Sequence, residues 1–331
     1  MTASGQLLDF PDARVFVREV GEGTPLLLVN GLGAHTAMWE PLERSLPGFR
    51  LVEFDLPGAG QSPVPRRPLS ITQLARLCTA VMDRHGMQRP HVLGYSMGGM
   101  VAQQLAASHP DRVDRLVLVA TSPGVGAVQA DPKALLNILT PVRYASARLY
   151  SGSIGSLVGG RARHDREWIA QQTALRFSHR PTWKGYAGQL RSMTGWSALP
   201  VLRDVQARTL VLSGGDDPLA PVTNGAMIAY LLPHARLRVL EGEGHLMALD
   251  EQSASHAVIR DFLSAPDPET SAAWTEGVRV DARQLHAALA QVRRQVPPLS
   301  WLDAKARRRW LGRVVTNPAG GSEPQPGLAR T

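Results

Sequence analysis

Short, almost wholly apolar segments alternate with longer amphipathic segments along most of the chain. Continuous apolar character is typical of strands that helices cover on both faces, whereas the longer segments repeat apolar residues at helical spacing. Pro110 and Pro233 follow two of these helical segments as stop signals. The alternation predicts an α/β fold with a mostly parallel central sheet and helices on both faces. Strands are expected at 15–20, 26–30, 49–54, 90–93, 113–120, 207–212 and 237–240, and helices at 71–84, 100–108 and 222–232.

Residues 124–200 break this alternation. They contain several tryptophans, glycines and arginines, including the stretches LYSGSIGSLVGG and WKGYAGQLRSMTGW. We interpret them as a mostly helical insertion between two strands of the sheet, and the regular pattern ends near Leu263, where SAPDPETS marks a boundary. The predicted parts are a first core segment (1–123), the insertion (124–200), a second core segment (201–265) and a C-terminal tail (266–331).

The tail predicts two short helices, at 284–296 and 300–315, separated by Pro297 and Pro298. A stretch rich in glycine and proline follows, and this composition is typical of a disordered end. The second helix carries tryptophan and leucine beside five basic residues, so it is a basic amphipathic segment. Such a helix can lie on a lipid or polymer surface. Packing against the core, with the arginines in water, is the simpler alternative.

Composition narrows the class of protein. With 331 residues, of which 44% are hydrophobic, the chain can bury a sizeable core. The net charge is +8, but only three residues are lysine, so a composition biased toward arginine explains the charge. No helix-turn-helix, zinc-finger or stacking-aromatic module is evident, and nucleic acid is not expected as a partner. No secretory signal or run of ~20 apolar residues is present, and the single Cys78 suits a reducing compartment, so we expect a cytoplasmic protein.

One serine lies between glycines in the segment HVLGYSMGGM. Gly94, Ser96 and Gly98 form the pattern Gly-x-Ser-x-Gly, with a predicted strand before it and a predicted helix after it. This is the context of a nucleophile elbow, in which a strained turn exposes the serine hydroxyl at the carboxyl edge of the sheet. The glycines remove Cβ atoms that would collide as strand and helix close together. Ser96 is therefore the candidate nucleophile.

A serine nucleophile needs a base to take its proton and an acid to orient that base. His245, in LEGEGHLMALDE after the last apolar strand, is the candidate base. Asp217 and its neighbour Asp216, in TLVLSGGDDPLAP, both follow a strand, and the spacing alone does not choose between them. The order serine, aspartate, histidine along the chain is that of α/β-hydrolases.

The stretch LLLVNGLGAH predicts the second half of an oxyanion hole. Leu32 follows an early strand, and its backbone N–H would join that of Met97, the residue after Ser96. A simple tight turn is the alternative for this loop. Asp55, in FDLPGAGQS, is interpreted as a turn-forming residue beside Gly58 and Gly60 rather than as the catalytic acid.

No metal or cofactor site is predicted. Histidines do not pair at i, i+4, and only one cysteine is present. The glycine-rich segment GYSMGG lacks both the spacing of a dinucleotide site and the lysine of a phosphate loop.

With these motifs assembled, the chain resembles the α/β-hydrolase superfamily over about residues 15–263. The segments NGLG, FDLPGAGQS, GYSMGG, SGGDDPLAP and GEGHLMALD carry the resemblance. A closer likeness is to intracellular poly(3-hydroxyalkanoate) depolymerases that act on medium-chain polyester, through NGLGAHTAMWEPL, DRVDRLVLVATSPG, TPVRYASARLYSG, GWSALPVL and GGDDPLAPVTN.

The resemblance implies a role for each candidate residue. Ser96 would be the nucleophile, Asp217 rather than Asp216 the acid, and His245 the base, while the insertion would form a cap over an acyl pocket. The tail from about Ala265 departs from the resemblance, because it is longer than such enzymes lead one to expect.

We therefore expect a cofactor-independent serine hydrolase that cleaves an aliphatic ester or polyester through an acyl-enzyme. Its partners would be that substrate and, through the basic helix, an inclusion or lipid surface. The alternatives are another hydrolase (a lipase, lactonase or C–C bond hydrolase), an acyltransferase, a cofactor-free haloperoxidase, or an inclusion-binding protein without activity.

Overall fold

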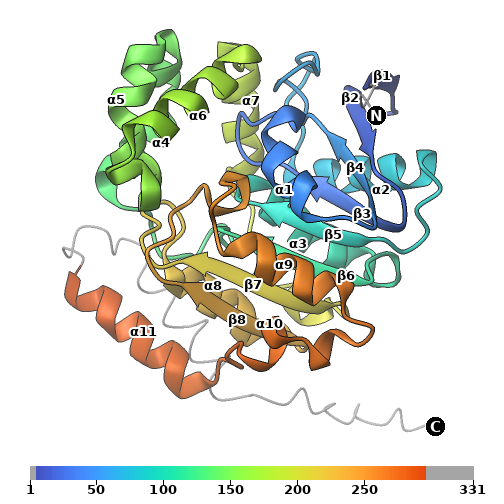
Figure 1. Ribbon diagram of the computed structural model, residues 1–331, viewed down its shortest axis with the longest axis vertical. Coiled ribbons are helices and arrows are strands. Elements are labelled where there is room, and N and C mark those ends of the chain that lie inside the picture. The colour runs from blue at the N-terminus through green and yellow to red at the C-terminus, as the bar shows by residue number, and fades with distance from the viewer. Residues whose placement is uncertain (1–4, 296–331) are drawn as a thin grey trace, which may run out of the picture. The chain divides into compact units, whose positions relative to one another are not determined.

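The computed structural model describes residues 5–295, which fall into two compact units. The first unit ends at Asp281 and is built on one sheet of eight strands in the order β1-β2-β4-β3-β5-β6-β7-β8 (Figure 1). β1 and β2 pair antiparallel with their neighbours, and all later pairs are parallel. The strands are β1 (Gln6–Asp9), β2 (Arg14–Val20), β3 (Thr24–Val29), β4 (Phe49–Phe54), β5 (His91–Tyr95), β6 (Arg115–Val119), β7 (Arg208–Gly214) and β8 (Ala235–Leu240).

Helices cover the sheet on both sides, as the apolar strands predict. α2 (Ile71–Arg84) and α3 (Met97–Ser108) pack together on one face, while α1 (Glu40–Ser45) and α9 (Ser255–Ser264) pack together, with α9 in front of the sheet in Figure 1. α8 (Val222–Leu231) follows β7 and packs on β7 and β8. The predicted α/β fold with a mostly parallel sheet is confirmed.

Four helices lie between β6 and β7, in the region predicted as an insertion. They gather at one end of the sheet, above the carboxyl ends of the central strands in Figure 1. We call residues 124–200 the insertion. Its helices are α4 (Pro132–Leu139), α5 (Ala147–Val158), α6 (Arg166–Ser178) and α7 (Trp183–Met193), with a short 3-10 helix, η3 (Pro141–Ala145), after α4.

The compact unit extends further than the boundary predicted after residue 265. Beyond that boundary the chain forms α10 (Ala272–Thr275), and Val278 then pairs with Leu237 of β8. Trp274 is buried and stacks on Phe262, with the ring centroids 6.0 Å apart. The composition of SAPDPETS marks a boundary, but the buried Trp274 ring and the pairing of Val278 with Leu237 hold the residues after it on the core.

The second unit contributes one described helix, α11 (Ala282–Gln295), at the position of the first predicted tail helix. The basic amphipathic helix predicted at 300–315 lies outside the described residues, so it stays a prediction. Within 5–295, no helix is both long enough and apolar enough to span a bilayer.

Candidate active site

Ser96 occupies the turn between β5 and α3 with a strained backbone. Its φ is 55° and its ψ is −119°, a conformation that residues with a side chain rarely adopt. The end of β6 holds it there, because its N–H donates to the Val119 carbonyl (2.9 Å) and its carbonyl accepts from the Thr121 hydroxyl (2.7 Å). Strain of this kind costs about 1–3 kcal/mol and persists mainly where a function requires it.

The glycines on either side of Ser96 are steric requirements of the turn. A Cβ at Gly98 would lie 2.0 Å from the Val29 carbonyl oxygen, and one at Gly94 would lie 2.6 Å from the Ala102 Cβ. Neither position has room for a side chain, since α3 packs directly against β3 and β5. The turn therefore starts α3 at Met97, three residues earlier than the sequence predicts.

A row of hydrogen bonds joins the three residues predicted as the catalytic set. His245 Nε2 lies 2.9 Å from Ser96 Oγ, and His245 Nδ1 lies 2.8 Å from Asp217 Oδ2. The other oxygen of Asp217 accepts the N–H groups of Leu219 (2.8 Å) and Ala220 (2.9 Å), which fixes the carboxylate. With Nδ1 donating to Asp217, Nε2 is free to accept the serine proton.

Asp216 points in a different direction from Asp217. It forms an ion pair with Arg163 and accepts the N–H of Gly160 (2.7 Å), both in the insertion. The hydrogen bond from Arg163 lowers the pKa of the Asp216 carboxyl. Of the two aspartates that the sequence leaves open, Asp217 alone reaches His245, while Asp216 ties the insertion to the β7 loop.

A comparison with known proteins assigns the chain to a family. The family model described as alpha/beta hydrolase fold matches residues 24–252. The chain belongs to the α/β-hydrolase fold family. It is 36% identical over 241 residues to a poly(3-hydroxyalkanoate) depolymerase of Ectopseudomonas oleovorans, an alignment that covers 72% of this chain and 84% of that protein.

Other relatives of this α/β hydrolase are more distant. It is 27% identical over 278 residues to 2-hydroxy-6-oxo-6-phenylhexa-2,4-dienoate hydrolase of Comamonas testosteroni, which covers 77% of this chain and 93% of that enzyme. Among solved structures, the enol-lactonase from Burkholderia xenovorans LB400 superimposes with a TM-score of 0.68 at 24% identity, covering 78% of this chain and all of the other. At that identity the likeness shows the fold alone.

The loop after β3, predicted to carry an oxyanion donor, runs against the elbow. A Cβ at Gly31 would lie 2.9 Å from the Tyr95 ring and 3.2 Å from the Ser96 Cβ. Asn30 braces the loop from within, since its side chain donates to the His35 carbonyl (2.9 Å) and accepts from the Gly31 N–H (3.0 Å). Leu32 lines the same cavity as Ser96, and Met97 is the first residue of α3.

Asp55 stabilises a neighbouring loop. It is fully buried and accepts the N–H groups of Thr36 (2.6 Å) and Gln61 (2.8 Å). Burial raises the pKa of its carboxyl to about 6, although those two N–H donors oppose the increase. Asp55 therefore shapes the turn after β4, as interpreted from the sequence.

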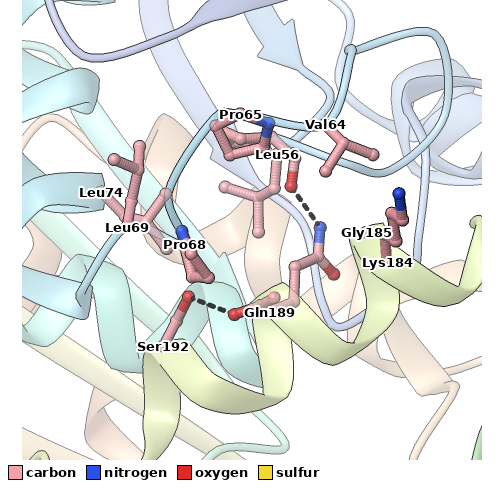
Figure 2. Close-up of a pocket in the computed structure, with 12 residues that line it drawn as sticks. Leu56, Val64, Pro65, Pro68, Leu69, Leu74, Lys184, Gly185, Gln189 and Ser192 are labelled. Atoms are coloured by element: carbon pink, nitrogen blue, oxygen red, sulfur yellow. Dashed lines mark hydrogen bonds between the residues drawn. The ribbon is translucent and has the colours of Figure 1, made fainter.

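Gln189 of α7 links the insertion to two loops of the core. Its side-chain oxygen accepts the Gly33 N–H (2.8 Å), one residue after Leu32, and its nitrogen donates to the Pro57 carbonyl (3.2 Å). Figure 2 shows this side chain reaching from α7 toward the loop after β4, in a shallow pocket that Leu56 and Gly185 also line. The insertion thus helps to position the loop that carries Leu32.

Replacing Gln189 with leucine is expected to lower kcat about 10- to 100-fold. The change leaves the Gly33 N–H and the Pro57 carbonyl without their partner, at about 1–3 kcal/mol for each buried group, and loosens the loop that carries Leu32. Steady-state hydrolysis of a soluble ester measures the effect. Ser192→Ala is the matched control, because Ser192 lines the same pocket but donates only to Gly188 of its own helix. Equal losses in both variants would contradict the role of Gln189.

A cavity that is partly open to solvent lies at Ser96 between the core and the insertion, and its empty space, the solvent at its mouth included, is about 400 Å³. Its wall is mainly apolar and aromatic. The core contributes Leu32, Tyr95, Ser96, Leu219, His245 and Leu246, and the insertion contributes Ile138, Arg143, Tyr144, Tyr150, Leu157, Val158 and Arg176. The backbone N–H of His245 donates to the Val158 carbonyl (2.6 Å), so the end of α5 also fixes the histidine loop.

Sequence reasoning missed the residues that the insertion adds to this site. Tyr150, Arg176 and Gln189 lie within α5, α6 and α7, and Tyr144 lies in η3. Nothing in their local pattern distinguishes a cavity wall from a helix interface, because the difference depends on where each helix packs.

Proposed function

We propose that this α/β hydrolase cleaves carboxylic esters through an acyl-enzyme, with Ser96 as nucleophile. The observation that carries the proposal is the hydrogen-bonded row from the strained Ser96 through His245 to Asp217. His245 takes the proton of Ser96 as its oxygen attacks the ester carbonyl, and then gives that proton to the leaving alcohol. It next activates water for deacylation, while Asp217 holds the Nδ1–H tautomer.

The tetrahedral intermediate carries an oxyanion, which the N–H groups of Leu32 and Met97 are proposed to bind. Met97 lies at the N-terminus of α3, where the helix dipole favours negative charge. The links from Asn30 and Gln189 hold the loop of Leu32 in place before substrate arrives. A donor fixed in advance needs no reorganisation during the reaction.

The proposed substrate is a medium-chain poly(3-hydroxyalkanoate) or an oligomer of it. The 36% identity to a depolymerase of that polyester supports the assignment, and the apolar cavity suits an aliphatic side chain. Apolar side chains are also exposed on the insertion, at Leu136 and Leu139 of α4, beside Ile138 in the cavity wall. Such a surface suits contact with a water-insoluble polyester.

Product analysis tests this proposal. Incubation with medium-chain polyester granules is expected to release soluble 3-hydroxyacids, with much less product from a short-chain polyester or a triacylglycerol.

The double substitution Leu136→Glu, Leu139→Glu is expected to lower the ratio of granule hydrolysis to soluble-ester hydrolysis about 10-fold, because two charges replace apolar contact area. Equal release from the medium-chain polyester, the short-chain polyester and the triacylglycerol would contradict the assigned substrate, and an unchanged ratio would contradict the role of the apolar surface of α4.

A further inference from the structure

A second arginine of the insertion faces the cavity that contains Ser96. Arg176 lies on α6 and lines the cavity together with Tyr95, Tyr144 and Tyr150. Only 5% of its surface is exposed to solvent. The reaction proposed above makes no use of it.

The guanidinium of Arg176 is buried without a counterion. Its Nε and Nη1 atoms have no hydrogen-bond partner, and in the described part of the chain no carboxylate forms an ion pair with it. Burial lowers its pKa, but the side chains of Tyr150, Tyr144 and Tyr95 more than offset that effect and the net pKa is raised, so the group stays charged. An unpaired buried charge is strongly destabilising, so it needs a reason to be there.

The other arginine in the cavity wall has structural partners. Arg143 donates to the carbonyls of Asn137 and Thr140 and to the hydroxyl of Tyr186. Its guanidinium also lies over the Tyr144 ring, 4.6 Å from the centroid. Arg143 therefore holds α4, η3 and α7 together, and only its Nε lacks a partner, whereas in Arg176 both Nε and Nη1 lack a partner among the described residues.

We propose that Arg176 binds a carboxylate of the substrate, so that the enzyme selects esters of a 3-hydroxyacid whose own carboxyl group is free. The proposal rests on the ester hydrolysis proposed above. In such a substrate the carboxylate is two carbons from the ester oxygen, so one molecule can present the carbonyl to Ser96 and the carboxylate to Arg176 within one cavity. Arginine is suited to this role, because its guanidinium stays charged and each of its N–H groups can donate a charge-assisted hydrogen bond to a carboxylate.

This arrangement sets the direction in which a polyester would be cut. Water cleaves the last ester of the chain, R–CO–O–CH(R′)–CH₂–COO⁻, into R–COO⁻, HO–CH(R′)–CH₂–COO⁻ and one proton. The shortened chain then ends in a new carboxylate, which is the group that Arg176 binds in the next round. The enzyme would remove single 3-hydroxyacids from the carboxyl end.

The test compares the linear dimer of 3-hydroxyoctanoate as the free acid with its methyl ester. We expect wild-type kcat/KM to favour the free acid about 10- to 100-fold, as a charge-assisted hydrogen bond in a buried site implies. Arg176→Met should bring the ratio close to one, and Arg176→Lys should keep part of it. Arg166→Met is the matched control, since Arg166 is an exposed arginine on the same helix, and it should keep the full ratio.

Thermal melting separates this role from a structural one. Removing an unpaired buried charge should leave the melting temperature of Arg176→Met equal to or above that of the wild type, whereas loss of a structural arginine would lower it. A wild-type ratio near one, a ratio retained in Arg176→Met, or an equal loss in Arg166→Met would overturn the proposal.

A binding measurement separates failure of this inference from failure of the proposed function. Calorimetry with 3-hydroxyoctanoate alone requires no chemistry. If wild type hydrolyses neither dimer, the ester hydrolase assignment fails, but binding that disappears in Arg176→Met would still support the carboxylate site. Absence of binding to the wild type would overturn it.

Discussion

Substitution of Ser96 by alanine is expected to lower kcat for a soluble ester about 10⁴- to 10⁶-fold. The change removes the only atom that attacks the carbonyl in the proposed mechanism. Folding should be preserved, because the contacts that hold residue 96 are made by its backbone to Val119 and Thr121. Steady-state hydrolysis of 4-nitrophenyl octanoate and a circular dichroism melt measure the two effects. A well-folded variant that retains a tenth of the wild-type rate would refute the mechanism.

Asp217→Asn is expected to lower kcat about 10⁴-fold without unfolding the protein. The N–H groups of Leu219 and Ala220 would keep the carboxamide oxygen, so its NH₂ group would face His245. His245 would then have to accept a hydrogen bond at Nδ1, which places its proton on Nε2. In that tautomer it cannot take the proton of Ser96.

The adjacent residue provides the matched control for this prediction. Asp216→Asn is the same chemical change one position earlier, but it weakens a half-exposed ion pair with Arg163, which contributes about 1 kcal/mol or less. We expect its activity to stay within a few-fold of the wild type. Similar large losses in the two variants would show that the β7 loop acts as a unit and would contradict the separate roles assigned to the two aspartates.

Elements with strong local signals were predicted closely from the sequence. The helix expected at 71–84 is α2, because Ser70 and Gln73 form a capping box that marks its start. The strand expected at 49–54 is β4, which is buried along nearly its whole length. β1 was not predicted, because it is a four-residue edge strand with mostly exposed side chains.

The candidate site was predictable to the extent that its residues lie in short loops after strands. Ser96, Asp217 and His245 each follow a strand of the parallel sheet, and the carboxyl ends of such strands meet at one edge. The choice between Asp216 and Asp217 depends on which way a side chain points, and so needed the resemblance or the structure. Arg176 and Gln189 depend on how the insertion packs on the core, which no local pattern in the sequence determines.

Covalent labelling tests the central claim most directly. After incubation with a fluorophosphonate, intact-protein and peptide mass spectrometry should find one adduct, on the peptide that contains Ser96. Ester hydrolysis should be lost in step with labelling, and Ser96→Ala should take up no label. Hydrolysis that continues in fully labelled protein, or an adduct on another residue, would contradict Ser96 as the nucleophile.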